Sequence, residues 1–125
     1  MLIRTPRNPG FTLIEVLVAL AIVGVALAAA SRSVALSTES ALQHKLQLLA
    51  GFVAENRLAE LTARRAWPGI GRIEGTERQA GIDFSWQADV YSTPHSRLRR
   101  VEIRVLDPVA PSHELRRVVG ILSRD

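Results

Sequence analysis

Glu15 is a carboxylate inside a long apolar run, and this placement is the first sign of chemistry in the chain. The run extends from Phe11 to Ala30, and its polar residues are Thr12 and Glu15. A charged side chain in a bilayer costs about 2–3 kcal/mol near the centre and less near the headgroups. Glu15 therefore either lies close enough to the headgroups to stay hydrated or pairs with a cation.

Gly10 precedes the run and suggests where such a cation could come from. If the chain were cut after Gly10, Phe11 would carry a new α-amine near the membrane edge. The Glu15 carboxylate of one subunit could then pair with the amine of a neighbour, which neutralises two charges that lipid disfavours. We therefore expect Glu15 to act in the ordered side-by-side assembly of such helices.

The remaining residue types offer little for catalysis or metal binding. His44, His95 and His113 are far apart and lack metal-ligand spacing, so we expect them to be solvated. Serine occurs without a nucleophile motif such as G-x-S-x-G, and the acidic residues form no EF-hand loop. The sequence has no cysteine, which excludes disulfides and thiolate chemistry. We expect no catalytic residue, no metal and no cofactor.

The charge of the chain does not favour a nucleic-acid partner. There are 16 basic and 12 acidic residues, a formal net charge of +4. Arg4 and Arg7 precede the apolar run, so 14 basic residues remain against 12 acidic ones past Gly10, a balance of +2. A nucleic-acid-binding domain would show a clustered basic face. We therefore expect no nucleic acid among the partners.

The apolar run has the length of a membrane helix. Its 20 residues span roughly 30 Å at about 1.5 Å per residue, the thickness of a bilayer's hydrocarbon core. Arg4 and Arg7 place residues 1–10 in the cytoplasm by the positive-inside rule, and the chain from about Ser31 onward outside it. A cleaved secretory signal is the alternative, since Ala28-Ala29-Ala30 offers a small-residue site. Such signals have shorter apolar cores, usually without a carboxylate.

Beyond the span, a helical pattern continues from Ser31 to about residue 64. One apolar stripe is followed by a second that is rotated around the helix axis, at about 100° per residue. This change predicts that one end of the helix packs on neighbouring subunits and the other on a head domain. The first stripe, the possible partner interface, is Leu42, Leu46, Leu49 and Val53, and the second is Ala54, Leu58 and Leu61.

The rest of the chain predicts a small antiparallel sheet. Trp67-Pro68-Gly69 ends the helix, and Gly69, Gly71 and Gly75 indicate a loop. Alternation of apolar and polar residues predicts strands, with a third and less regular one near the end of the chain. These strands are Ile82–Val90, Arg100–Val105 and Leu115–Leu122. The expected fold class is α+β, with one long helix packed on an antiparallel sheet of three or four strands.

At its N-terminal end, the chain resembles type IV pilins and pseudopilins. The segment G-F-T-L-I-E-V-L-V-A-L from Gly10 to Leu20, after a short basic leader, is similar to their class III signal. The resemblance implies cleavage between Gly10 and Phe11 by a prepilin peptidase, N-methylation of Phe11, and an assembly role for Glu15. It divides the chain into a leader (1–10), a transmembrane helix (11–30) and a periplasmic head (31–125). The chemistry would be the peptidase's, so this chain is expected not to be an enzyme.

The head narrows the resemblance to the I-type minor pseudopilin of type II secretion systems. The segments that carry it are V-A-E-N-R-L-A-E-L from Val53, Trp67-Pro68, G-x-x-F-x-W from Gly81, and L-R-R-V-E-I-R-V from Leu98. It implies a single-pass inner-membrane protein at the tip of a periplasmic pseudopilus. Its implied partners are J-, K- and H-type minor pseudopilins, the major pseudopilin and prepilin peptidase. A minor pilin of a type IV pilus or competence fibre is the alternative, and a single-pass periplasmic binding module or enzyme is another.

Overall fold

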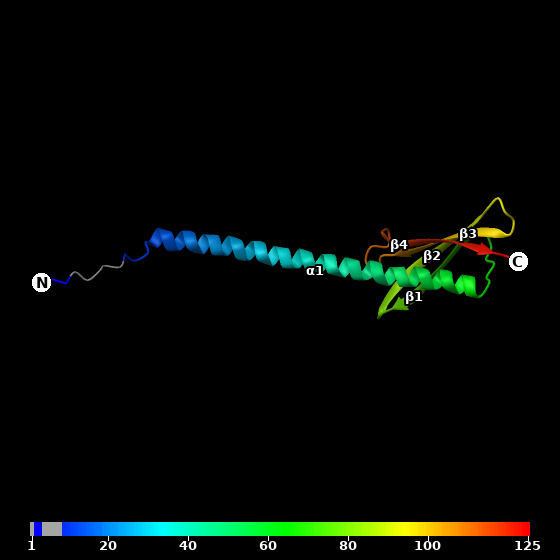
Figure 1. Ribbon diagram of the computed structural model, residues 1–125, viewed down its shortest axis with the longest axis horizontal. Helices are drawn as coiled ribbons and strands as arrows, with labels where there is room; N and C mark the ends of the chain where they lie inside the picture. Colours follow the sequence, from blue (N-terminus) through cyan, green and yellow to red (C-terminus); the bar gives the residue numbers. More distant parts are fainter. Residues whose placement is uncertain (1, 4–8) are drawn as a thin grey trace. The chain divides into compact units, whose positions relative to one another are not determined.

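The computed structural model describes residues 2–3 and 9–125 and forms one long helix and a four-stranded antiparallel sheet (Figure 1). Helix α1 extends over Leu13–Ala63, and the strands follow in the order β1-β2-β3-β4. Their bounds are Gly71–Gln79 for β1, Ile82–Ser92 for β2, Leu98–Leu106 for β3 and Glu114–Ser123 for β4. The predicted α+β class, with a long helix on a small antiparallel sheet, is confirmed. Arg4 and Arg7, on which the predicted orientation depends, lie outside the described residues.

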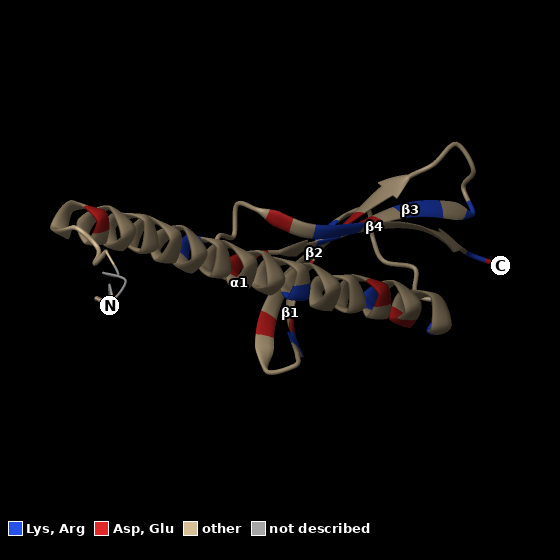
Figure 2. Ribbon diagram, turned by 60° about the vertical axis from the view of Figure 1, so that its left-hand side comes forward, with Lys and Arg blue, Asp and Glu red and all other residues tan. Residues whose placement is uncertain are grey.

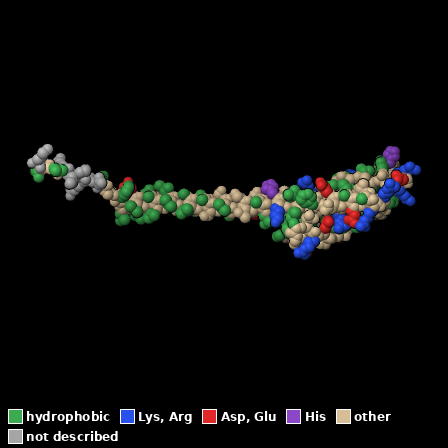
Figure 3. Space-filling model, turned by 60° about the horizontal axis from the view of Figure 1, so that its bottom comes forward, with side chains coloured by type: hydrophobic (Ala, Val, Ile, Leu, Met, Phe, Trp, Pro, Cys, Tyr) green, Lys and Arg blue, Asp and Glu red, His purple; other side chains and the backbone are tan. Residues whose placement is uncertain are grey.

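The chain divides into two compact units, residues 1–40 and residues 41–125. In the first unit, α1 is long and apolar enough to cross a membrane, and its apolar window is not buried in the chain. Hydrophobic side chains cover this part of α1 on the face that Figure 3 shows. Charged residues are sparse there and frequent on the strands and the last turns of α1 (Figure 2). This distribution fits the predicted membrane span.

In the second unit, α1 packs one broad apolar face on the sheet. Leu46, Ala50, Val53 and Ala54 are buried in the core, and Leu49, Leu58 and Leu61 pack against it. At about 100° per residue these positions fall on one wide stripe, so the two stripes read from the sequence are a single face. The expectation that the first stripe meets a partner needs correction for Leu46, Leu49 and Val53, because the chain's own sheet covers them. Leu42 is 53% exposed.

The three predicted strands are confirmed and supply the other half of the core. Alternate residues of β2 and β3 face α1, with Ala88 opposite Ile103 and Val90 opposite Val101. All four are buried, together with Phe84 and Val105. The less regular pattern at β4 has a physical cause, because the register shifts between Val105 and Leu106. A shift of this kind breaks the two-residue alternation.

Strand β1 replaces the loop expected around Gly69, Gly71 and Gly75. No residue of β1 is buried, so the strand lacks the apolar alternation by which the other three are recognised. It pairs with β2 without interruption from Gly71 to Gln79. Gly75 lies under the indole of Trp86, since a Cβ at this position would come within 2.5 Å of the Trp86 ring. The glycine therefore marks a close approach inside a strand.

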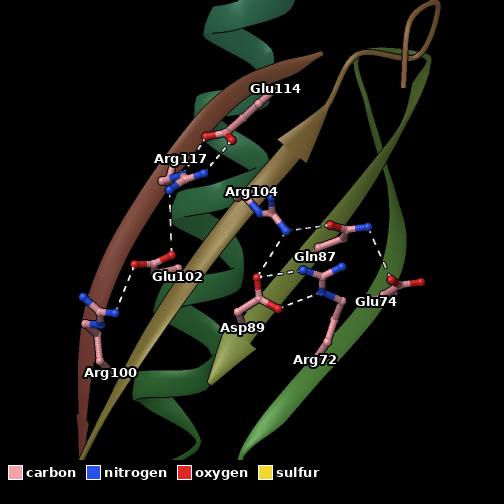
Figure 4. Close-up of polar contacts among 9 residues, drawn as sticks. All are labelled: Arg72, Glu74, Gln87, Asp89, Arg100, Glu102, Arg104, Glu114 and Arg117. Atoms are coloured by element: carbon pink, nitrogen blue, oxygen red, sulfur yellow. Dashed lines mark hydrogen bonds and ion pairs between the residues drawn. The ribbon is translucent and has the colours of Figure 1, made fainter. Parts of the chain in front are cut away.

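On the face of the sheet away from α1, charged side chains link neighbouring strands (Figure 4). Asp89 of β2 accepts hydrogen bonds from Arg72 of β1 at 2.7 and 3.2 Å and from Arg104 of β3 at 3.2 Å. The carboxylate is nearly buried, with the residue 9% exposed. The hydrogen bond from Arg72 lowers the pKa of Asp89, although burial opposes this shift. Asp89 therefore holds three strands together in its ionised form.

We predict that Asp89→Asn destabilises the head by about 1–3 kcal/mol, since it leaves two arginines without their common carboxylate. The loss corresponds to about 4–8 °C in Tm per kcal/mol for a domain of this size. Thermal unfolding of the full chain in detergent can be followed by fluorescence, because both tryptophans, Trp67 and Trp86, lie in the head. Asp83→Asn is the matched control, because Asp83 and its partner Arg78 are 62% and 70% exposed. An equal effect of both variants would contradict the prediction.

The stabilisation by Asp89 should also depend on pH. The folded-state pKa of Asp89 lies below its unfolded value, which is about 3.9 for aspartate. The extra stability of wild type over Asp89→Asn is then complete above about pH 4 and is lost as pH falls through the lower folded-state pKa. Melting of both proteins across this range measures the difference, and a gap that persists unchanged at the most acidic pH would contradict it.

Candidate functional site

The Gly10–Phe11 peptide bond lies outside the helix. Helix α1 begins at Leu13 rather than at Phe11, where the predicted membrane helix begins. Phe11 is 84% exposed, and among the described residues, apart from its chain neighbours, no heavy atom lies within 4 Å of where a Cβ of Gly10 would be. A protease needs an accessible, non-helical bond, because helical hydrogen bonds keep the backbone from an active site. The bond predicted to be cut therefore has a suitable local structure.

Thr12 and Glu15 explain why the helix begins at Leu13. The Thr12 N–H donates to Oε2 of Glu15 at 3.4 Å, and the Glu15 N–H donates to Oγ1 of Thr12 at 3.3 Å. This reciprocal pair is a capping box, which satisfies two N–H groups that the first turn leaves free. The carboxylate also lies at the positive end of the helix dipole. Glu15 thus has a structural role within its own chain.

The capping role of Glu15 was not expected from the sequence, although the sequence contains the signature of a capping box. Thr or Ser followed three residues later by Glu or Gln, before an apolar run, is the signature of a capping box. Thr12-Leu13-Ile14-Glu15 fits it. Glu15 therefore lies in the first turn of α1. Its pairing with the Phe11 amine of a neighbouring subunit stays a prediction.

Arg57 and Trp86 form a second cluster, within the head. The Arg57 guanidinium lies 4.8 Å from the centroid of the Trp86 ring, a cation–π contact. Its Nη1 is 3.0 Å from a Glu60 carboxylate oxygen, and its Nε is 3.6 Å from Oε2 of Glu77 in β1. Trp86 in turn covers Gly75. The cluster connects the A-E-N-R-L-A-E-L segment of α1 with the G-x-x-F-x-W segment of β2.

Arg99 and Trp67 connect two further segments in the same way. The Arg99 guanidinium lies 4.3 Å from the Trp67 ring centroid and donates a hydrogen bond to the backbone carbonyl of Pro68. This contact fixes the chain after α1 against β3. The four segments that carry the sequence resemblance are therefore two contacting pairs. Both tryptophans are half-buried against the core.

The histidines form no site in the structure. His44, His95 and His113 are exposed. Within residues 2–3 and 9–125, no group of three or more histidine and carboxylate side chains is placed to hold a metal ion.

The outward side of α1 carries large apolar residues that the head leaves uncovered. Leu48 is 61% exposed and Phe52 is 47% exposed. They are four residues apart, so they lie on one face of the helix. That face lies opposite the one that packs on the sheet, at about 100° per residue. Exposed apolar pairs of this kind are candidates for contact with another protein.

Comparison with known proteins finds a match for the head and another for the N-terminal end of the chain. Residues 45–123 match the family model for type II secretion system (T2SS), protein I, and residues 5–31 match the prokaryotic N-terminal methylation motif. The chain is 39% identical over 99 residues to type II secretion system protein I of Pseudomonas aeruginosa, covering 79% of this chain and 77% of the relative. The protein of the same name from Escherichia coli is 37% identical over 98 residues, covering 77% and 78%. That of Pectobacterium carotovorum is 32% identical over 100 residues, covering 78% and 83%.

We predict that Arg57→Met destabilises the head by about 1–2 kcal/mol, because it removes the cation–π contact and two carboxylate partners while keeping an apolar stem. Urea unfolding of the full chain in detergent, followed by tryptophan fluorescence, measures the change. Arg64→Met is the control, because Arg64 pairs with the same Glu60 but has a side chain that is 76% exposed. This variant should stay within about 0.5 kcal/mol of wild type. A larger loss for Arg64→Met than for Arg57→Met would be evidence against the cluster.

Proposed function

Because the chain belongs to the family of type II secretion system protein I, we propose that it is a non-enzymatic minor pseudopilin. It acts as a tip and initiation subunit of the periplasmic pseudopilus and supports export of folded proteins across the outer membrane. One observation carries the proposal: a single chain joins an N-terminal methylation motif and an apolar helix to a head that matches protein I. The alternative, a minor pilin of a type IV pilus or competence fibre, is less favoured because the family match covers the head.

The proposed maturation begins with cleavage by prepilin peptidase between Gly10 and Phe11, followed by N-methylation of Phe11. The methylation motif and the exposed, non-helical position of these residues support this step. Residues 1–10 are then a cytoplasmic leader, and the head is periplasmic. An apolar helix at this end of the chain fits a single-pass inner-membrane protein.

The proposed partners are other pseudopilins, with J-, K- and H-type minor subunits and the major subunit as candidates. The outward face of α1 is the proposed contact surface, in place of the stripe expected from the sequence. Leu46, Leu49 and Val53 are engaged in the head, whereas Leu48 and Phe52 of the outward face are exposed. Leu42 is exposed as well, but it belongs to the stripe expected from the sequence. Subunits anchored in one membrane would place such helices side by side.

Processing predicts a defined mass for the purified membrane-bound chain. In cells with an active prepilin peptidase, the intact mass should correspond to residues 11–125 plus one methyl group. The same chain from cells that lack the peptidase should begin at Met1 and carry no methyl group. Intact-protein mass spectrometry measures both. A mass that begins at Met1 despite an active peptidase, or at Ser31, would overturn the processing step.

Glu15→Gln separates the capping role of Glu15 from its proposed assembly role. Glutamine can close a capping box but carries no charge. We predict normal cleavage and an about tenfold loss of co-purification with partner pseudopilins, equivalent to about 1.4 kcal/mol. Thr12→Val removes the cap and keeps the carboxylate, so it should lower co-purification less than Glu15→Gln does.

Glu15→Ala removes both the cap and the charge. Its co-purification with partner pseudopilins should therefore be the lowest of the three variants. If Glu15→Gln co-purifies like wild type while Thr12→Val and Glu15→Ala fail, the capping role alone accounts for Glu15. Charge pairing with the Phe11 amine would then be disproved.

A further inference from the structure

The end of the head where α1 finishes carries five arginines from three separate parts of the chain. Two of them follow the last residue of α1, two lie in the β2–β3 hairpin and the start of β3, and one follows β4. The end of α1, this hairpin and the C-terminus lie at the same end of the head (Figure 1). We call this set of residues the basic end: Arg64, Arg65, Arg97, Arg99 and Arg124.

Contacts between the three parts hold the basic end together. The Arg65 guanidinium is 3.3 Å from a carboxylate oxygen of Asp125. The Arg124 N–H donates to the backbone carbonyl of Arg97 at 2.9 Å. Arg99 is held by its cation–π contact with the chain after α1. The arginines therefore lie close to one another in the fold, although up to 60 residues separate Arg64 from Arg124 in the sequence.

The excess positive charge of the head falls at this end. Residues 41–125 contain 13 basic and 10 acidic residues, a formal net charge of +3. The basic end has its five arginines against two carboxylates, Glu60 and Asp125, which also gives +3. The other eight basic and eight acidic residues of the head cancel. The head is therefore neutral apart from one end.

Ion pairs within the chain neutralise only part of the basic end. Glu60 pairs with Arg64 at 3.1 Å, and Asp125 pairs with Arg65. Within residues 2–3 and 9–125, three arginines of the basic end have no carboxylate partner: Arg97, Arg99 and Arg124.

Local structure accounts for some of these cations and not for others. Cations just after a helix interact favourably with its dipole, which explains Arg64 and Arg65. Arg99 is fixed by Trp67. Arg97 and Arg124 are exposed at the ends of strands, where nothing in the head compensates their charge. Because gathered like charges repel and destabilise the compact state, a negatively charged partner would relieve a cost that the isolated head bears.

An exposed apolar strip adjoins the basic end on the face of the sheet away from α1. Tyr91 of β2, Arg100 of β3 and Ile121 of β4 lie opposite one another in the sheet. Tyr91 is 39% exposed and Ile121 56%, and Val119 follows on the same face of β4 at 52%. Ile121 is three residues from Arg124. Exposed apolar residues bordered by polar ones mark contacts with other proteins.

The aromatic residues at this end do not favour a nucleic acid. Single-stranded nucleic acids bind where aromatic rings are open to stack on bases. The Arg100 guanidinium lies 4.8 Å from the Tyr91 ring centroid, and Arg99 lies on Trp67 in the same way. The other apolar residue next to the basic end, Ile121, is aliphatic and cannot stack. An acidic protein surface is the better match.

We propose that the basic end and the adjoining apolar strip are the docking surface for a different protein of the secretion machine, one that presents carboxylates around an apolar centre. The proposal rests on the proposed function, since it takes the partner from the same assembly, and it adds a contact separate from the outward face of α1. Arg97 and Arg124 pair with the carboxylates, and the apolar centre covers Ile121. Charge complementarity of this kind governs mainly the rate and specificity of association.

A second copy of this chain does not fit this surface. In a twofold dimer the same patch meets itself, so one basic end would face another and the cations would repel. A head-to-tail contact would need a negatively charged surface elsewhere on the head. Outside the basic end, however, the acidic and basic residues are equal in number. The occupant is therefore a different, acidic protein.

Site-specific photo-crosslinking of the full chain tests this proposal in cells with the complete secretion machine. A benzophenone amino acid is placed at Ile121, at Leu48 on the outward face of α1, or at Val109. Val109 lies between β3 and β4, at the opposite end of β3, and is 87% exposed, so it is a control with greater access than Ile121. We expect Ile121 to crosslink to a different protein of the machine, at a segment with Asp or Glu residues identified by mass spectrometry. Its yield should be at least about tenfold above that of Val109.

Charge reversal provides the second measurement. With the crosslinker at Ile121, Arg97→Glu should lower the yield about tenfold. Arg78→Glu is the matched control and should not, because Arg78 is 70% exposed and pairs with Asp83, away from the basic end. Tryptophan fluorescence melting establishes that each variant is folded. Lysine in place of the partner's crosslinked carboxylate should restore the yield with Arg97→Glu, and equal yields for the two folded variants would contradict the proposal.

The other outcomes also overturn the proposal. These are an Ile121 product no stronger than that from Val109, one with twice the mass of this chain, one formed with lipid or nucleic acid, and a partner segment without carboxylates. A Leu48 product with a pseudopilin, in the absence of an Ile121 product, disproves docking at the basic end and leaves the proposed function intact. Absence of both products counts against both.

Discussion

The packing of α1 side chains on the sheet is the contact on which the head depends. Small residues make it possible: Ala50 and Ala54 are fully buried on the helix. On the sheet, Gly120 of β4 faces Leu58, and a Cβ there would come within 2.4 Å of the Leu58 side chain. The glycine lets the Leu58 side chain lie directly on the strand backbone, and each such apolar contact matters in a head with a modest core. The same contact decides which side of α1 remains free for other subunits.

Polar and aromatic contacts extend this core to segments that bury little themselves. Arg57 on Trp86 and Arg99 on Trp67 attach the edge of the sheet and the chain after α1. Asp89, held by Arg72 and Arg104, joins three strands on the opposite face. The strength of these contacts depends on the distance and orientation of the charged groups more than on the apolar area that they bury. They fix β1 to the rest of the head although none of its residues is fully buried.

Glu15 has a shown role within its own chain and a proposed one in assembly. In the single chain it completes a capping box with Thr12, so its carboxylate has a partner before any assembly takes place. In the proposed assembly, the amine that the proposed cleavage creates at Phe11 would offer a stronger, charged partner. A cap at 3.3–3.4 Å is a weak pair of hydrogen bonds, and weak intrachain bonds are easily exchanged for a charged contact.

The sequence by itself determined the long apolar helix, the N-terminal methylation motif, the fold class and the three apolar strands. Each of these follows from local composition or from periodicity, since periodicity records which residues become buried. Strand β1 has no fully buried residue, so its sequence carries no apolar alternation from which the strand could be predicted. Periodicity also could not tell whether Leu46 and Val53 face a partner or the chain's own sheet, because both are apolar surroundings. Only the tertiary structure decided this, and it alone brought Arg57 to Trp86, since contacts between distant segments leave no local pattern.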